Sequence, residues 1–176
     1  MSRRTRGRAG AVGAHGAATP AIAACAAAGV DHLVHHLGHG DTDHFGEEAA
    51  GILAERGIVP DRVLKTLVVE LSGRRTGLAV AVVPVPRRLD LKACARAFGA
   101  SKAAMADPAA AQRSSGYVVG GISPLRQKRR LPTVIDASAR DHATVFVSAG
   151  RRGLDLELAP ADLAELAGAT FSPVCA

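Results

Sequence analysis

Two apolar runs separated by a short polar segment constrain the fold of this chain more than any other feature. Residues 63–71 and 77–85 are rich in valine, leucine and alanine, and each has the length of a buried strand. Ser72-Gly73-Arg74-Arg75 between them has the composition of a turn. The pattern predicts an antiparallel hairpin, in which residues 63–71 are apolar enough to form a central strand.

Helices and shorter strands are predicted around this hairpin. Thr19 and Pro20 are typical of a helix start and Gly29 of a helix end, so together they predict a helix over residues 21–28. Similar signals predict helices over 45–56, 90–98, 107–113 and 160–168, and strands over 32–37, 133–136, 144–148, 154–158 and 170–174. Adjacent strands mixed with helices favour an α/β domain of the α+β type over a doubly wound fold, with helices packed on a mixed, largely antiparallel sheet.

The composition narrows the class of protein. A chain of 176 residues with 48% apolar content suits one domain, which we assign to residues 19–176, after a disordered leader over residues 1–18 rich in arginine, glycine and alanine. Aromatic residues make up 3%, which argues against an aromatic platform for single-stranded nucleic acid. No apolar run approaches the roughly 20 residues of a membrane span, and the leader lacks the apolar core of a secretory signal. Three widely separated cysteines fit reduced thiols, so we expect a cytoplasmic location and no membrane contact.

The formal net charge of +6 is carried in part by two clusters. Four arginines lie in the leader, which by itself is uninformative. The second cluster, here called the basic run, consists of Arg126, Lys128, Arg129 and Arg130. Basic clusters are most often solvated surface, but one beside a candidate site is suited to a polyanion such as RNA.

That candidate site is the glycine loop, residues 116–124, with the sequence Gly116-Tyr117-Val118-Val119-Gly120-Gly121-Ile122-Ser123-Pro124. Adjacent glycines reach dihedrals closed to other residues and leave their N–H groups uncovered, while the proline stiffens the segment. Such a loop can present amides to a carbonyl or a phosphate. Taken alone, the same pattern also fits a tight turn between two buried elements.

Five histidines between residues 32 and 44 could in principle bind zinc. On a strand, however, His35 and His36 point to opposite faces, and no HExxH or CxxC motif occurs, so we predict no metal site. A GxxxxGK[ST] loop, a GxGxxG loop and a GxSxG elbow are also missing from the sequence. A nucleotide-binding loop and a serine triad therefore have no support, and no cofactor is predicted.

Two charged residues stand within otherwise apolar strands. Lys65 lies in the first strand of the hairpin, and Asp155 is flanked by leucines near residue 154. A charged side chain in such a strand must reach a cleft, reach the surface or pair with an opposite charge. Spacing alone does not bring either residue to the glycine loop.

Several longer motifs join these features in one order. They are Phe45-Gly46-Glu47-Glu48, Leu64-Lys65-Thr66-Leu67, Met105-Ala106-Asp107-Pro108, the segment 112–125 around the glycine loop, the segment 127–136 and the segment 152–158. In these motifs the chain, over residues 19–172, closely resembles the YbaK-type Cys-tRNA(Pro) deacylases, relatives of the editing domain inserted in bacterial prolyl-tRNA synthetases.

The resemblance implies a trans-editing enzyme that removes cysteine mischarged onto tRNA(Pro), and that acts in some members on Cys-tRNA(Cys). It implies catalytic roles for Lys65, Gly120, Gly121 and Asp155. It implies substrate contacts from Tyr117, Ile122, Ser123, Pro124 and Asp136, with His36 and His39 as further candidates. The implied partners are the acceptor end of tRNA(Pro), held by the basic run, and a prolyl-tRNA synthetase.

Under this resemblance the substrate is the aminoacyl ester of a charged tRNA. This ester is already activated, so its cleavage needs no strong nucleophile from the protein. Amides near Gly120 and Gly121 would stabilise the oxyanion, a contribution of roughly 3–4 kcal/mol per well-placed donor. Lys65 would hold the ribose-phosphate end as a point charge. In this family the thiol of the substrate is thought to attack the ester, giving a cyclic thiolactone. Ser123 is then expected to shape the loop rather than to act as a nucleophile.

One position departs from the resemblance. The family often has a tyrosine where this chain has Leu37. If that tyrosine holds the substrate, this chain has lost the contact or replaced it with His36 or His39. An alanine-specific editor, a non-catalytic module that binds tRNA or a synthetase, and a metal-dependent hydrolase using the histidines are therefore retained as alternatives.

Overall fold

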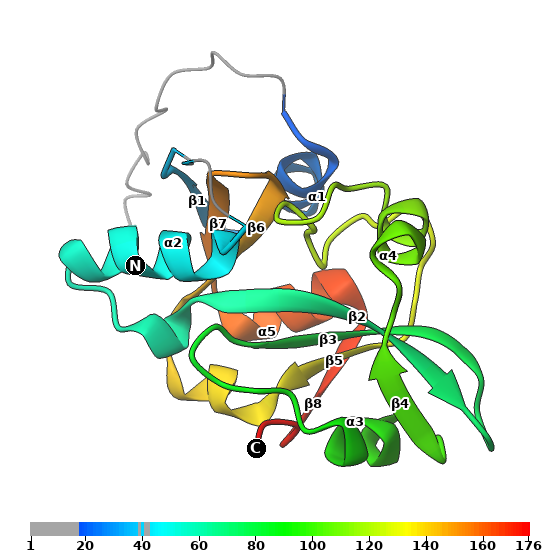
Figure 1. The fold of residues 1–176 in the computed structure, drawn as a ribbon. Coiled ribbons are helices and arrows are strands. Elements are labelled where there is room, and N and C mark those ends of the chain that lie inside the picture. Colours follow the sequence, from blue (N-terminus) through cyan, green and yellow to red (C-terminus); the bar gives the residue numbers. More distant parts are fainter. Residues whose placement is uncertain (1–17, 39, 41–42) are drawn as a thin grey trace, which may run out of the picture.

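The structure is a computed structural model that describes residues 18–38, 40 and 43–176 (Figure 1). At its centre the two long apolar runs form the predicted antiparallel hairpin. β2 (Leu64–Ser72) pairs with β3 (Gly77–Pro84), and Lys65 lies opposite Val83. The hairpin prediction is confirmed.

The described residues form eight strands, which are arranged in two sheets. A five-stranded sheet has the order β4-β2-β3-β5-β8, in which β4 (Lys102–Met105) is antiparallel to β2, whereas β5 (Thr133–Asp136) and β8 (Ala169–Ser172) run parallel to β3. A three-stranded antiparallel sheet has the order β1-β7-β6, formed by β1 (His32–His36), β7 (Leu154–Leu158) and β6 (Val145–Arg151). The predicted α/β class with mixed pairing is confirmed, but the strands are divided between two sheets rather than joined in one.

The helices begin and end at the residues that the sequence indicates. Thr19, Asp90 and Asp107 each accept a backbone N–H at a helix start. Glycines in the left-handed conformation end four of the helices. The helical elements are α1 (Pro20–Ala28), α2 (Phe45–Glu55), η1 (Pro60–Arg62), α3 (Leu91–Phe98), α4 (Pro108–Ser115), η2 (Ala137–Asp141) and α5 (Pro160–Ala167). None of the helices in these described ranges has both the length and the apolarity needed to cross a membrane.

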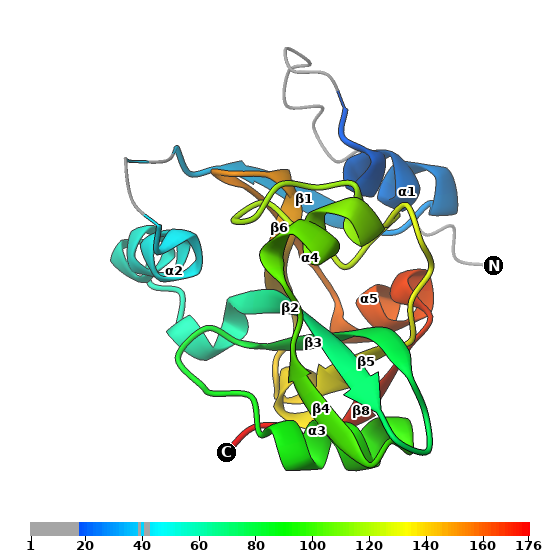
Figure 2. The same cartoon turned by 45° about the vertical axis from the view of Figure 1, so that its right-hand side comes forward.

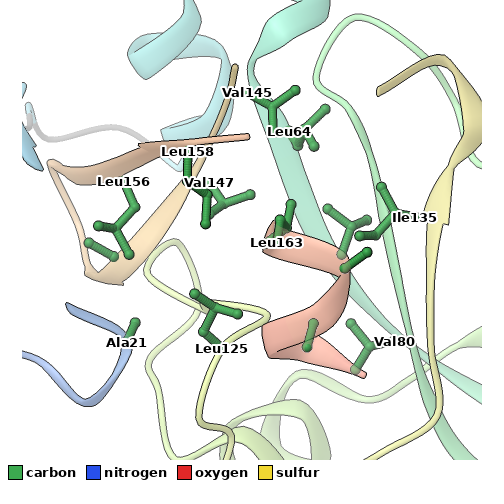
Figure 3. Packing of buried hydrophobic residues seen from close by; sticks show 14 of the residues in the cluster. Ala21, Leu64, Val80, Leu125, Ile135, Val145, Val147, Leu156, Leu158 and Leu163 are labelled. Carbon is green, nitrogen blue, oxygen red and sulfur yellow. The ribbon is translucent and has the colours of Figure 1, made fainter. Parts of the chain in front are cut away.

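The largest hydrophobic cluster joins the two sheets (Figure 3). Leu163 of α5 packs with Val80 from the five-stranded sheet and Leu156 from the three-stranded sheet, and all three are at most 1% exposed. Leu125, immediately after the glycine loop, is fully buried in the same cluster. The loop is therefore anchored in the core at its C-terminal end.

A smaller cluster lies beneath α2 and positions the candidate site. It contains Leu37, Leu53, Val63 and Phe146, together with Val85 at the end of β3. In Figure 2, α2 lies on one side of the molecule and α1 and α5 lie on the other. Leu53 of α2 shares this cluster with Val63, just before β2, and with Phe146 of β6, so side chains from the edges of both sheets meet at α2.

Candidate active site

A cavity of about 320 Å³ lies where the N-terminal end of α2 faces the start of β2 and the three-stranded sheet. We call it the main cavity. Its lining includes four residues predicted from the sequence, namely Lys65, Gly120, Ile122 and Asp155. These residues come from β2, the glycine loop and β7, so the fold brings together parts of the chain that are far apart in sequence.

Lys65 is half-buried at the start of β2. Its Nζ donates a hydrogen bond to the backbone oxygen of Val85, 3.1 Å away. The N–H of Val85 in turn donates to the oxygen of Val63, at 2.8 Å. The ammonium group is thus tied to the adjoining strand and still borders the cavity, where it can attract an anionic or carbonyl oxygen.

Asp155 is 8% exposed and lies on β7, opposite His35 of β1 and Ser148 of β6. Within the described ranges its carboxyl group forms no hydrogen bond or ion pair. Burial raises the pKa of Asp155 to about 7. A carboxyl group with this pKa exchanges a proton readily near neutral pH, as general acid–base catalysis requires.

Gly120 is the point of closest approach between the glycine loop and α2. Its φ is +88°, and a Cβ placed there would lie 2.1 Å from Cδ2 of Phe45. The N–H of Gly121 donates to the oxygen of Val118 at 2.9 Å, so this amide is already used within the loop. Gly120 and Ile122 line the cavity, and neither N–H donates a hydrogen bond to another described residue. Of the two predicted glycine amides, that of Gly121 is used within the loop, and that of Gly120 forms no hydrogen bond with another described residue.

Three predicted substrate contacts instead support the loop from behind. The hydroxyl of Ser123, which is fully buried, accepts the N–H of Leu125 at 3.2 Å. The hydroxyl of Tyr117 donates to the oxygen of Leu125 at 2.7 Å. Pro124 lies next to these residues and is also buried. None of Ser123, Tyr117 and Pro124 lines the main cavity, so their geometry fits a role in shaping the loop.

Other predicted contacts lie away from the main cavity. Asp136 accepts hydrogen bonds from Ser138, Val174 and Cys175, and thereby anchors the C-terminal segment. His36 is exposed at the end of β1, and His39 lies outside the described residues. Leu37, which replaces the tyrosine of the related family, is 8% exposed and packs in the cluster beneath α2 rather than lining the cavity.

The basic run is solvent-exposed. Arg126 and Arg130, with Pro124 and Gln127, line a second cavity of about 230 Å³ near the end of α5. Lys128 and Arg129 are exposed outside it. The segment 120–124 therefore borders the main cavity at Gly120 and Ile122 and the second cavity at Pro124.

Three of the histidines among the described residues contact protein groups. His32 contacts the oxygen of Val30 at 2.7 Å, His35 contacts Glu157 at 2.8 Å and His44 contacts Glu47 at 3.0 Å. No group of three or more His, Cys, Asp or Glu side chains in the described part of the chain has the arrangement of a metal site.

Sequence reasoning assigned no role to several other residues at the site. Thr66, Ser148 and Phe45 line the main cavity, and the hydroxyl of Thr66 is buried with no hydrogen-bond partner among the described residues. Arg152 contacts two lining residues: its guanidinium carbon is 4.2 Å from the centre of the Phe45 ring, and its Nε donates to the oxygen of Val119 at 3.0 Å. The signal for Arg152 was its place in the turn before Asp155, within a motif quoted for other reasons.

Comparison with known proteins identifies the family. Residues 46–166 match the model of the aminoacyl-tRNA editing domain. A protein of Enterococcus faecalis named "Putative Cys-tRNA(Pro)/Cys-tRNA(Cys) deacylase EbsC" is 36% identical over 132 residues, which cover 75% of this chain and 78% of that protein.

Two solved structures share the fold at lower identity. One is described as "a putative trans-editing enzyme for prolyl tRNA synthetase", with a TM-score of 0.72, 21% identity, and coverage of 90% of this chain and 98% of the other. The second, hypothetical protein APE2540, has a TM-score of 0.72, 24% identity, and coverage of 86% and 96%. The family model covers more than half of the chain, and the chain therefore belongs to the aminoacyl-tRNA editing domain family.

Proposed function

We propose that this protein is a trans-editing deacylase that clears cysteine from tRNA(Pro), and also acts on Cys-tRNA(Cys). The observation that carries the proposal is the convergence of Lys65, Asp155 and Gly120 on one cavity. The main cavity, at about 320 Å³, lies within the range of small-molecule sites and suits an aminoacyl end rather than a folded tRNA element. The name of the Enterococcus faecalis relative supports the choice of substrate.

In the proposed reaction the substrate supplies the nucleophile. The thiol sulfur of the bound cysteine bonds to the ester carbonyl carbon, and the bond from that carbon to the ribose oxygen breaks. The products are uncharged tRNA and a cyclic thiolactone. Asp155 moves the proton: its carboxylate accepts the proton of the thiol and its acid form gives that proton to the leaving ribose oxygen.

The remaining groups hold charge in place. The N–H groups of Gly120 and Ile122 stabilise the oxyanion that forms from the ester carbonyl. Donors that are fixed in advance need no reorganisation as this negative charge develops. Lys65 binds the ribose-phosphate end of the acceptor strand. The basic run, with Arg126 and Arg130 at the second cavity, contacts phosphates further along the acceptor arm. We place this reaction in the cytoplasm, with a prolyl-tRNA synthetase as the proposed protein partner.

A panel of charged tRNAs tests the proposal. Purified protein is incubated with Cys-tRNA(Pro), Ala-tRNA(Pro), Pro-tRNA(Pro) and Cys-tRNA(Cys), with and without a prolyl-tRNA synthetase, and the surviving ester is measured. We expect loss of the cysteine ester above the buffer rate, and a fall of about 100-fold for Lys65→Ala. Lys102→Ala, which removes an exposed lysine of β4, is the matched control and should retain activity.

Each alternative predicts a different result in the same panel. Faster loss of Ala-tRNA(Pro) than of Cys-tRNA(Pro) would identify an alanine-specific editor. Tight, salt-sensitive tRNA binding with no ester loss would identify a binding module. Activity that disappears with a chelator and returns with zinc would identify a metal-dependent hydrolase.

A further inference from the structure

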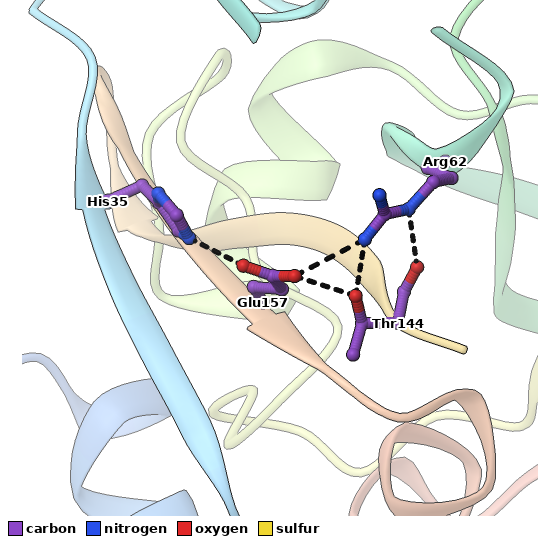
Figure 4. Close-up of polar contacts among 4 residues, drawn as sticks. All are labelled: His35, Arg62, Thr144 and Glu157. Atoms are coloured by element: carbon purple, nitrogen blue, oxygen red, sulfur yellow. Dashed lines mark hydrogen bonds and ion pairs between the residues drawn. The ribbon is translucent and has the colours of Figure 1, made fainter. Parts of the chain in front are cut away.

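Four polar side chains form a connected network beside the main cavity without lining it (Figure 4). Glu157 is at its centre. One carboxylate oxygen contacts Nε2 of His35 at 2.8 Å, and the other accepts from Thr144 Oγ1 at 2.6 Å and from the guanidinium of Arg62 at 3.2 Å. Arg62 also donates through Nε to the backbone oxygen of Thr144 at 2.9 Å and contacts the Thr144 hydroxyl. The polar atoms of the four residues are therefore bound mainly to one another.

On one side the network holds the start of β2. Arg62 ends η1, three residues before Lys65. Between them, Val63 forms a parallel bridge with Phe146 of β6, which is the point where the two sheets are joined by backbone pairing. A displacement of Arg62 would consequently move the segment that carries Lys65.

On the other side the network holds β7. Glu157 lies two residues beyond Asp155, so both side chains project from the same face of that strand. His35 is the cross-strand partner of Asp155, and its imidazole contacts Glu157. The contact between His35 and Glu157 thus holds β1 against β7, the strand that carries Asp155.

An aromatic ring packs against two members of the network. Phe146 is fully buried, its ring centre lies 5.1 Å from that of His35, and the guanidinium carbon of Arg62 lies 5.2 Å from the same ring. Both His35 and Arg62 therefore pack against this buried ring as well as bonding to Glu157. The network is consequently tied both by hydrogen bonds and by packing.

The electrostatics of the Glu157–Arg62 pair favour a role in positioning the strands over a role in stabilising the fold. The side chains of Glu157 and Arg62 are 16% and 22% exposed, so pairing them carries a desolvation cost that offsets most of the attraction. Burial would raise the pKa of Glu157, but the hydrogen bonds from Thr144 and His35 and the charges of His35 and Arg62 outweigh it and hold the pKa below its usual value. Glu157 therefore stays ionised, as a fixed acceptor must.

We propose that this network is a positioning device that sets the separation of Lys65 from Asp155 across the main cavity. The inference rests on the proposed function, in which these two residues act on one ester. His35, Arg62, Thr144 and Glu157 are positioning residues, because none of them touches the cavity. A displacement of about 1 Å between catalytic groups can cost on the order of 100-fold in rate.

Two substitutions at Thr144 provide the test. Thr144→Val removes the hydroxyl with little change of shape and no change of charge, whereas Thr144→Ser keeps the hydroxyl. For Thr144→Val we expect kcat on Cys-tRNA(Pro) to fall about 10- to 100-fold with KM within about twofold, and for Thr144→Ser we expect recovery of most of the rate. Asp61→Asn is the matched control, because Asp61 is in the same η1 turn but is 43% exposed and pairs with Arg87 at 2.9 Å. It should leave kcat unchanged.

A second readout does not depend on activity. Backbone amide chemical shifts of Lys65 and Asp155, measured by heteronuclear NMR, should change in Thr144→Val and stay near wild type in Thr144→Ser and Asp61→Asn. If wild-type protein cleaves no charged tRNA, the proposed function fails, and the chemical shifts still decide the positioning role. If Thr144→Val does not fold by circular dichroism, Glu157→Gln replaces it, with the same expected results.

The positioning role is overturned by unchanged kcat and unchanged chemical shifts in Thr144→Val. It is also overturned if Thr144→Ser is as impaired as Thr144→Val, since the hydroxyl would then be irrelevant. An equal loss in Asp61→Asn would show that any loosening of η1 has the same effect, and would overturn it as well.

Discussion

Replacing Asp155 with asparagine is expected to stabilise the protein at neutral and alkaline pH while it removes activity. The asparagine has nearly the same shape but no charge to bury. Because burial raises the pKa of Asp155 from 3.8 to about 7, the native state holds a proton that the unfolded chain releases between these values. The wild-type protein therefore loses stability as pH rises from about 4 to about 7, and above that range the loss is constant.

The magnitude follows from the size of that pKa change. A difference of about three units corresponds to an upper limit of about 4 kcal/mol, at 1.36 kcal/mol for each unit. Roughly 2.5 kcal/mol of this falls between pH 5 and pH 8 for a single group that titrates in this way. Asp155→Asn should thus be close to wild type near pH 4 and progressively more stable than wild type toward pH 8.

Urea unfolding measures this difference. The chain has no tryptophan and one tyrosine, so far-UV circular dichroism is the suitable signal. Wild type and Asp155→Asn are unfolded at half-unit steps from pH 5 to pH 8.5, and the free energies are subtracted, which removes the groups that the two proteins share. Two parallel pH profiles would refute the reasoning, because they would show that Asp155 has the same pKa in the folded and unfolded states.

Two further predictions concern the loop and the basic run. Gly120→Ala places a Cβ against the aromatic ring of α2 at a φ of +88°, so we expect a loss of about 1–3 kcal/mol in urea unfolding and loss of deacylation. Gly29→Ala, at a φ of +65° with nothing within 4 Å, is the matched control and should cost about 1 kcal/mol with activity retained. Replacing both Arg126 and Arg130 with glutamine should weaken tRNA binding and lower the slope of log affinity against log salt by about 2, with urea unfolding unchanged. An unchanged slope would place the tRNA contact elsewhere.

Local signals predicted the elements well, because capping and turn formation involve neighbouring residues. Thr19 caps the start of α1 and Gly29 caps its end, as expected, and the turn at 72–76 joins β2 to β3. β4 was missed, since Lys102–Met105 is short, rich in alanine and paired only because α3 brings it beside β2. The division into two sheets was missed for a similar reason, because the pairing of strands far apart in sequence leaves no local pattern.

The site was predicted in part. The sequence did not predict which side of each segment faces the cavity. Motifs in one order indicate which segments meet, but they do not tell which side of a segment faces the cavity. Gly120 and Gly121 are adjacent in the loop, yet one lines the cavity and the other bonds to Val118. Tyr117 belongs to the same loop, but its hydroxyl bonds to a backbone oxygen inside the protein. The roles of Gly121 and Tyr117 in the reaction thus remain predictions that their geometry does not favour.

Two carboxyl groups on β7 show how one strand can serve two purposes. Asp155 has no polar partner among the described residues, and burial raises its pKa to about 7. Glu157, two residues away on the same face, has three partners that together hold its pKa below its usual value. Environments that drive the pKa values of neighbouring acids apart separate a group that exchanges protons from a group that stays ionised. On this basis the proton transfer in the proposed reaction belongs to Asp155, while Glu157 keeps its charge and holds the strand from which Asp155 acts.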